Sequence, residues 1–378
     1  MKAAKLIKIH GVRLLVVTAF MFLLLSGFAS PAAAAQNTIG EVYTLTNAAG
    51  GNAVLVFERA TNGNLSLQGS YPTGGLGSGA GLGSQGAAIL GENNHWLFAV
   101  NAGSNQVSVF EVQKHGLNLV DIVGSGGSSP ISLTLHEELL YVLNAGGSGN
   151  ISGFSVNEDG SLTPLPGSTQ PLSNDGIGAA PGPAEIAFGS DGTTLVVTEK
   201  ATNLIDTYQV EDGIAAAPVA HTSSGATPFG FAFDQHNHLI VSEAFGGAAN
   251  SSAVSSYFVH EDEFDAVSPS IATTQTAACW IAISKNGKYA YTTNAGSGTI
   301  SSYGIGSDGA LTLLNPAAGS TGAGSSPVDM AFSNNGAYLY ALGAAAHTIS
   351  IFQMSADGSL VSLGSIGVPA GVVGLAAR

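Results

Sequence analysis

The chain has 378 residues, a formal net charge of −15 at pH 7 and only ten Lys and Arg residues. So few cations argue against a nucleic-acid partner, because such binding depends on neutralising phosphates. They also argue against a phosphorylated substrate, which is usually held by an Arg or Lys clamp. The one cysteine, Cys279, excludes an intramolecular disulfide.

The first 35 residues have the features of a targeting segment. Four basic residues precede an apolar run at 14–28, and small residues at 30–35 match a signal-peptidase site. The run is short for a membrane span, so we predict a signal peptide over 1–35, with a retained anchor as the alternative. Its removal would take the net charge from −15 to −19, because those four residues carry the segment's only charges. We expect the mature chain to be a periplasmic or extracellular monomer without a membrane span.

The segment 128–165 shows most plainly a pattern that continues along the chain. Four apolar runs, ISLTL, LLYVLN, ISGFSV and SLTPL, are separated by turns rich in Gly, Asn and Asp. Runs of this kind between such turns are typical of short strands joined by hairpins. The segment therefore predicts one four-stranded antiparallel unit.

The same unit recurs seven times. Its second strands end at Asn47, Asn101, Asn144, Glu199, Glu243, Asn294 and Gly343. The successive spacings are 54, 43, 55, 44, 51 and 49 residues. A period of about 40–50 residues with four strands per unit predicts an all-β, seven-bladed β-propeller over 36–378.

The two ends of the pattern complement each other. The N-terminal unit has no first strand, and the tail Gly367–Ala376 resembles a first strand with nothing after it. We expect these ends to share one blade, which closes the ring and leaves no open sheet edge.

Strand pairing selects residues for a common site. The first strand of a blade lines the axial channel and the second runs antiparallel to it, so the start of one and the end of the other lie on the same face. The residues expected at this rim are Glu185, Glu199, Lys200, Glu243, Trp280, Asp329, Asn101, Asn144 and Asn294.

Two interpretations of the rim remain open. Several carboxylates close together would raise one another's pKa for general acid–base work, or would bind Ca²⁺ through oxygen ligands. Alternatively, the asparagines make only local hydrogen bonds in turns, and this interpretation is favoured because asparagine is common in turns. Asp329 would then form hydrogen bonds between neighbouring blades. For Glu185 the sequence supports a functional and a structural role equally. We assign no other metal site: His236 and His238 fall in a turn between first and second strands, where a solvated turn is favoured.

The repeat PxxxAFSxxGxYLY…N…ISxF…xDGSL resembles the bacterial lactonase family of seven-bladed propellers. That family includes 6-phosphogluconolactonase-like and 3-carboxymuconate cyclase-like enzymes, and the repeat is also similar to surface propellers with a Tyr-Val-Thr-Asn signature. The resemblance covers the whole expected mature chain. It implies the propeller fold and, as an activity, hydrolysis or rearrangement of a small lactone.

The chain departs from the family at the positions that the resemblance implies are catalytic. Ala184 and Glu185 stand where an Arg-His pair would follow a Gly-Pro, and the family's Asn-Glu element becomes Glu199-Lys200. The loop Gly81–Ala88 also has no histidine. Glu185 would then be the general base, assisted by Glu199 or Lys200.

Two functions follow as hypotheses. The first is an exported enzyme that hydrolyses or rearranges an unphosphorylated lactone or related small acid, with no cofactor or with Ca²⁺ at the rim. The second is a binding or scaffold propeller without catalysis, which would hold an envelope partner on the rim around Trp280.

Overall fold

A computed structural model describes residues 38–260 and 263–378. The expected signal peptide lies outside these residues. These described residues form one compact unit. In the described part the regular structure is strands, together with one short 3₁₀ helix, η1 (Phe245–Gly247). None of the helical structure there is long and apolar enough to cross a membrane.

The strands form seven sheets, named here blades 1 to 7 and given from the inner strand outward. Blade 1 contains β30 (Val373–Ala377), β1 (Thr38–Leu45), β2 (Ala53–Ala60) and β3 (Leu65–Pro72). Blade 2 contains β4 (Ala88–Leu90), β5 (Trp96–Asn101), β6 (Gln106–Gln113) and β7 (Gly116–Gly124). Blade 3 contains β8 (Pro130–His136), β9 (Leu139–Asn144), β10 (Asn150–Val156), β11 (Leu162–Pro164) and β12 (Gln170–Pro171).

The other four blades follow in chain order. Blade 4 contains β13 (Pro183–Phe188), β14 (Thr194–Glu199), β15 (Leu204–Glu211), β16 (Ile214–Ala215) and β17 (Val219–Thr222). Blade 5 contains β18 (Pro228–Phe233), β19 (His238–Glu243), β20 (Ala253–His260) and β21 (Glu263–Ala272). Blade 6 contains β22 (Ala278–Ile283), β23 (Tyr289–Asn294), β24 (Thr299–Ile305) and β25 (Leu311–Ser320), and blade 7 contains β26 (Pro327–Phe332), β27 (Tyr338–Gly343), β28 (Thr348–Met354) and β29 (Leu360–Gly367).

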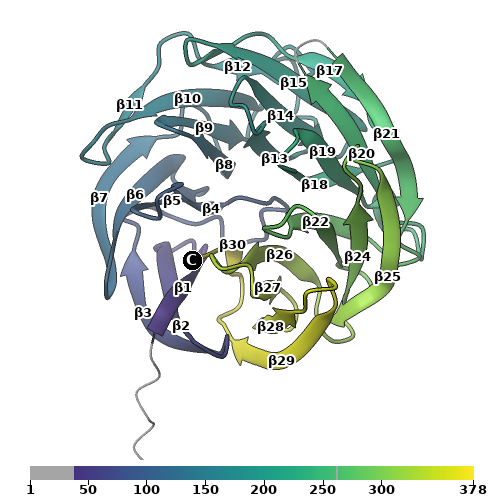
Figure 1. The fold of residues 1–378 in the computed structure, drawn as a ribbon. Helices are drawn as coiled ribbons and strands as arrows, with labels where there is room; N and C mark the ends of the chain where they lie inside the picture. Colours follow the sequence, from purple (N-terminus) through teal and green to yellow (C-terminus); the bar gives the residue numbers. More distant parts are fainter. Residues whose placement is uncertain (1–37, 261–262) are drawn as a thin grey trace, which may run out of the picture. The chain divides into compact units, whose positions relative to one another are not determined.

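The ring of seven blades and its closure are confirmed (Figure 1). Each inner strand contacts the inner strands of both neighbouring blades, in the order β30, β4, β8, β13, β18, β22, β26 and back to β30. Strand β30 pairs antiparallel with β1, with Val42 opposite Ala377 and Leu45 opposite Val373. The chain's two ends therefore share blade 1, as the sequence predicts.

Burial explains why these segments form strands in this order. All six residues of β14, β19 and β27 are buried, because a second strand is covered on both faces by neighbouring blades. The outermost strand β29 is mostly exposed. In blades 3 and 4 the outer strand is split into β11/β12 and β16/β17, with Pro166 and Pro218 in the gaps, since proline cannot donate to the ladder.

Tyrosine hydroxyls join adjacent blades. Near the middle of three second strands, a buried tyrosine donates its O–H to the carbonyl of a turn glycine in the next blade. The pairs are Tyr141 with Gly213 (3.0 Å), Tyr291 with Gly358 (2.7 Å) and Tyr340 with Gly63 (3.1 Å). The last pair joins blade 7 to blade 1, across the junction where the two ends of the chain meet.

Tyr340→Phe tests this closure. The variant leaves the Gly63 carbonyl without its buried donor, so we expect a loss of about 1–2 kcal/mol in the free energy of unfolding. Urea denaturation measures it. Tyr71→Phe is the matched control, because the Tyr71 hydroxyl bonds only Gln68 of its own blade. Equal effects of the two substitutions would contradict a special role for the junction.

Candidate functional site

A β-bulge near the start of the inner strand determines where Glu185 and Asp329 point. In blades 3 to 7 the pairing of the first and second strands shifts register at this place, for example between Pro183 and Glu185 and between Pro327 and Asp329. A bulge leaves backbone groups unpaired in the ladder and redirects side chains. The residue following the bulge therefore presents its N–H outside its own sheet.

In blades 3 to 6 an acceptor from another part of the ring meets this N–H group, and in blade 7 the side chain of Asp329 accepts it from the next residue, Met330. The acceptor atoms and the residues that donate to them are Gly86 O for Leu133, Ser132 Oγ for Ile186, Glu185 Oε2 for Phe231, Gln85 Oε1 for Ile281 and Asp329 Oδ1 for Met330. Glu185 thus links blade 4 to blade 5 at 2.6 Å. Asp329 also accepts a backbone hydrogen bond from Leu375 of blade 1. Both carboxyls have the inter-blade role that the sequence analysis considered for Asp329.

Glu185 and Asp329 also line one cavity on the propeller axis. Its volume is about 390 Å³, and it runs along the inner strands β4, β8, β13, β26 and β30. Glu185 and Asp329, near the starts of β13 and β26, are only 6% and 2% exposed. Two other lining residues, Leu135 near the end of β8 and Phe332 at the end of β26, are partly exposed. The carboxyls therefore lie at the deep end of a cavity whose other end is more accessible.

Burial dominates the electrostatics of this pair. Desolvation raises the pKa of Glu185 well above its usual range, and the nearby charge of Asp329 raises it further. Desolvation likewise raises the pKa of Asp329, against the opposing effect of its two backbone donors. Asp329 Oδ2 is buried without a hydrogen-bond partner. Desolvation therefore favours the protonated form of the two carboxyls.

The segment Gly81–Gly86, here called the plug, closes the deep end of the cavity. Gln85 reaches blade 6, where its Nε2 donates to Ile281 O at 2.7 Å, and Ser84 Oγ donates to Ile131 O of blade 3 at 2.7 Å. Gln85 occupies space left by Gly230, since a Cβ at that glycine would come within 2.5 Å of Gln85 Oε1. The plug thus covers the face where the sequence predicted an open rim.

Lys200 and Trp280 hold the plug in place. Lys200 Nζ donates to Gly83 O at 2.6 Å and to Pro183 O at 2.9 Å, and it lies over the Phe229 ring. Burial lowers the pKa of Lys200 to about 8. Trp280 is 4% exposed and donates from Nε1 to Ser84 O at 3.0 Å. In this structure both side chains anchor the plug and neither forms an open rim.

Glu199 belongs to a different cluster. With Asp206 of β15 it forms a buried carboxyl pair, and the Ser173 N–H donates to both side chains at 3.0 Å. Thr202 Oγ1 also donates to Glu199. Burial and the adjoining Glu199 raise the pKa of Asp206 to about 8. The pair lies between the second and third strands of blade 4, and neither residue lines the axial cavity.

The remaining expected rim residues bond within their own blades and the adjoining crossovers, except that Asn101 also accepts from Asn52 of blade 1 at 3.1 Å. Glu243 accepts from Gly225 N at 2.8 Å and from the hydroxyls of Ser255 and Ser270. Asn101 donates to Ser108 Oγ, Asn144 to Asn150 Oδ1 and Asn294 to Ser301 Oγ, at 2.7–2.9 Å. Of the four carboxylates expected together, only Glu185 and Asp329 line the same cavity. Glu199 and Glu243 lie in separate clusters, so the four do not form the single oxygen-rich rim considered for Ca²⁺.

Two relevant residues escaped the sequence analysis. Gln85 was passed over within a glycine-rich loop, although it is the one long polar side chain of Gly81–Gly86. Asp206 lies on the third strand of blade 4, where most of the expected inward-facing residues are apolar. A charged residue within the strand sequence LIDTYQV could have indicated it.

The ring and its axial carboxyl pair define a seven-bladed propeller with a candidate acid–base site. The model of the family described as "Lactonase, 7-bladed beta-propeller" matches residues 43–170, 148–263 and 248–373. The chain belongs to this lactonase family, which confirms the resemblance seen in the sequence.

Solved structures agree on the fold. A candidate 6-phosphogluconolactonase of Bacteroides fragilis is 19% identical, with TM-score 0.66 over 92% of this chain and 100% of that one. The Pseudomonas aeruginosa periplasmic gluconolactonase is 15% identical, with TM-score 0.66 over 88% and 98%. A Lactobacillus plantarum protein is 16% identical, with TM-score 0.70 over 90% and 99%. No curated protein matches the sequence.

The raised pKa of Asp329 predicts how stability depends on pH. A folded-state pKa above the unfolded value gives stability that is complete below the unfolded pKa, near 4. That stability is lost as pH rises towards the folded-state pKa. Asp329→Asn keeps the Oδ1 acceptor and cannot ionise, so we expect a higher melting temperature than wild type at pH 8 and little difference at pH 4. Calorimetry at both pH values measures this, and a lower melting temperature at pH 8 would contradict it.

Proposed function

We propose that this protein hydrolyses an unphosphorylated lactone in the axial cavity, using Glu185 and Asp329 as a general base and a general acid. The observation that carries the proposal is that these two buried carboxyls line the same cavity of about 390 Å³. That volume lies in the range of small-molecule sites, roughly 300–1,000 Å³.

The structural role of Glu185 does not require a carboxylate. Ser132 makes the equivalent inter-blade hydrogen bond in blade 3 with a hydroxyl, and Gln85 makes one to blade 6 with an amide. A buried carboxyl costs more than either neutral group, because its charged form is poorly solvated. Perturbed carboxyls in a cavity are typical of functional sites.

The two carboxyls have complementary settings for acid–base work. Glu185 Oε2 accepts the Phe231 N–H, which favours its ionised form, and it would take a proton from water as that water attacks the lactone carbonyl. Asp329 Oδ2, which has no partner, would be protonated and would give its proton to the departing ring oxygen. Water is thereby added across the ester bond, and the product is a hydroxy acid.

The cavity's lining favours an uncharged substrate. None of the described residues that line it is Lys or Arg, so a phosphate group would meet no cation beside the two carboxyls. The name of the Bacteroides fragilis protein implies a phosphorylated lactone, which this cavity is not suited to bind. A sugar lactone of the kind named for the Pseudomonas aeruginosa relative fits better.

We propose further that the chain is exported, cleaved near Ala35 and present as a monomer. The basic and apolar pattern of residues 1–35 supports export. N-terminal sequencing of the protein from its native cells, and light scattering of the purified form, would test the cleavage site and the oligomeric state.

The activity test compares variants on a panel of unphosphorylated sugar lactones. Glu185→Gln keeps an acceptor for the Phe231 N–H and removes the base, so we expect kcat/KM to fall by about 10²–10⁴-fold. Asp329→Asn should lower it similarly. The wild-type rate should rise with pH through a pKa above that of ordinary glutamate, because the base must be ionised.

Glu211→Gln is the control, since Glu211 is exposed on the outer part of blade 4 and should leave the rate unchanged. Ring opening by folded wild type no faster than buffer, or equal rates in wild type and Glu185→Gln, would overturn the catalytic proposal.

A non-catalytic binding propeller at the cell envelope is the second candidate function. The observation that favours it is the plug, which covers one end of the axial cavity, buries Trp280 and partly covers Lys200. Such a protein would bind a lactone or an envelope partner without turnover. Calorimetric binding of a lactone that wild type does not hydrolyse would support this function over the first.

A further inference from the structure

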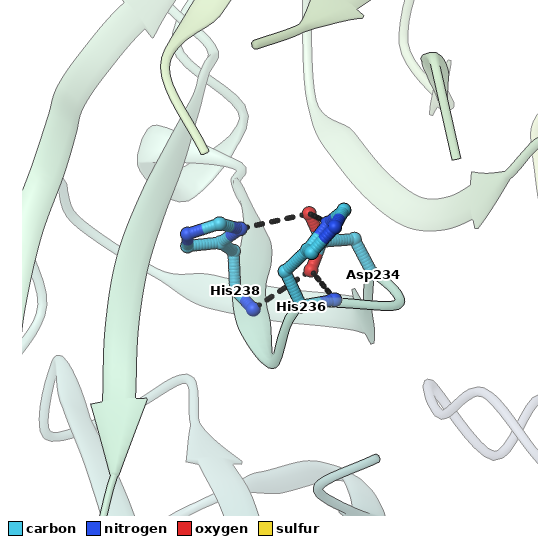
Figure 2. Close-up of side chains that lie close together, drawn as sticks. All are labelled: Asp234, His236 and His238. Atoms are coloured by element: carbon cyan, nitrogen blue, oxygen red, sulfur yellow. Dashed lines mark hydrogen bonds and ion pairs between the residues drawn. The ribbon is translucent and has the colours of Figure 1, made fainter. Parts of the chain in front are cut away.

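A second cluster of chemistry-bearing side chains lies in the turn between β18 and β19. Asp234 follows β18, His238 begins β19, and His236 lies between them (Figure 2). One potential ligand atom from each of the three residues lies within 4.8 Å of the other two. Among residues 38–260 and 263–378, this is the one group of three or more His, Cys, Asp or Glu side chains with such spacing.

The turn holds Asp234 rigidly and leaves one of its oxygens directed at both histidines. Asp234 Oδ1 accepts the backbone N–H groups of His236 and His238, at 2.8 and 2.9 Å. Asp234 Oδ2 lies 2.8 Å from His238 Nδ1 and 4.0 Å from His236 Nδ1. Both Asp234 and His238 are buried, whereas the His236 side chain is 67% exposed. The solvated turn expected from the sequence therefore applies to His236 and not to His238.

Packing also fixes the ring of His238. Its imidazole lies against Gly309 of blade 6, where an added Cβ would come within 2.6 Å of the ring. The Phe258 ring is 6.3 Å away, centre to centre. Two of the three potential ligands are thus preorganised, and the third lies at the surface, where it can turn without disturbing the core.

These separations suit a small divalent ion with mixed nitrogen and oxygen ligands. Tetrahedral Zn²⁺ with bonds of about 2.0–2.1 Å holds its ligand atoms about 3.3 Å apart. The distance from Asp234 Oδ2 to His238 Nδ1 would have to widen slightly, and the exposed His236 would move closer. One carboxylate with two imidazoles suits Zn²⁺ and other transition metals, whereas Ca²⁺ takes six to eight oxygens.

We propose that Asp234, His236 and His238 form a binding site for one divalent transition-metal ion of the zinc class. Asp234 Oδ2 and the two imidazoles supply three ligands, and water completes the fourth position. Nδ1 must be free of hydrogen to bind the metal, so the hydrogen bond between His238 Nδ1 and Asp234 Oδ2 is replaced when the ion binds. The site lies outside the residues that line the axial cavity and is independent of the proposed hydrolysis.

Calorimetric titration of the untagged, chelator-treated mature protein with ZnCl₂ tests the site. We expect one Zn²⁺ per chain and a higher melting temperature with the metal than without it. His236→Ala should weaken binding at least about tenfold, since it removes a direct ligand. This exposed residue can be replaced without disturbing the core.

Two further variants make the test specific. Asp234→Asn can keep the Oδ1 acceptor for the turn and replaces the charged ligand by an amide, so it should also weaken binding. His347→Ala removes an exposed histidine from blade 7 and should leave the affinity unchanged.

Titration with Co²⁺ gives a readout of geometry. Visible absorption bands of a four-coordinate ion should appear in wild type and be lost in His236→Ala. The proposal is overturned if wild type takes up no Zn²⁺, or if both His236→Ala and Asp234→Asn bind it with wild-type affinity.

Discussion

The ring depends on how its inner strands hydrogen-bond across blade boundaries. Each bulge at the start of an inner strand leaves an N–H group outside its sheet, and in blades 3 to 6 an acceptor from another part of the ring meets it. A backbone carbonyl, a serine, a glutamate and a glutamine fill this role. In blade 7, Asp329 accepts from the next residue, Met330, and a backbone hydrogen bond from Leu375 links it to blade 1. The requirement also explains the plug, because blade 5 has Gly230 at the corresponding position and Gln85 supplies the missing acceptor.

The same constraint ties structure to chemistry. Since the acceptors must lie at the deep end of the axial cavity, replacing a neutral acceptor by a carboxyl places an ionisable group there without altering the backbone. Glu185 and Asp329 satisfy their neighbours' N–H groups and still present an oxygen each for other use. This allows a propeller that lacks the Arg-His pair implied by its family resemblance to keep titratable groups on its axis.

The fold could be predicted from the sequence because its signals are local. Strand alternation can be seen within each blade, Asp-Gly or Asn-Gly turns recur in several blades, and comparison of the blades gives a period near 49 residues. The unmatched ends implied the closure. Glu185 and Asp329 were found through their spacing from proline. Glu199 and Glu243 do not line the axial cavity, because the inner strand separates the second strand from the axis. Their side chains bond instead to the crossover segments that enter their own blades. The path of the plug depends on contacts almost 200 residues apart, such as Gln85 with Ile281, which no local pattern encodes.

The shared blade has a consequence for the order of folding. Strand β1 (Thr38–Leu45) pairs on one side with β2 and on the other with β30, which is synthesised more than 300 residues later. Until Val373–Ala377 emerge, blade 1 has three strands and an exposed edge able to pair with another chain. The contacts that complete it, including Arg378 with Glu41 at 2.6 Å, are among the most non-local in the protein. Ring closure should therefore be a late and slow step, and the open ring before it the species most prone to aggregate.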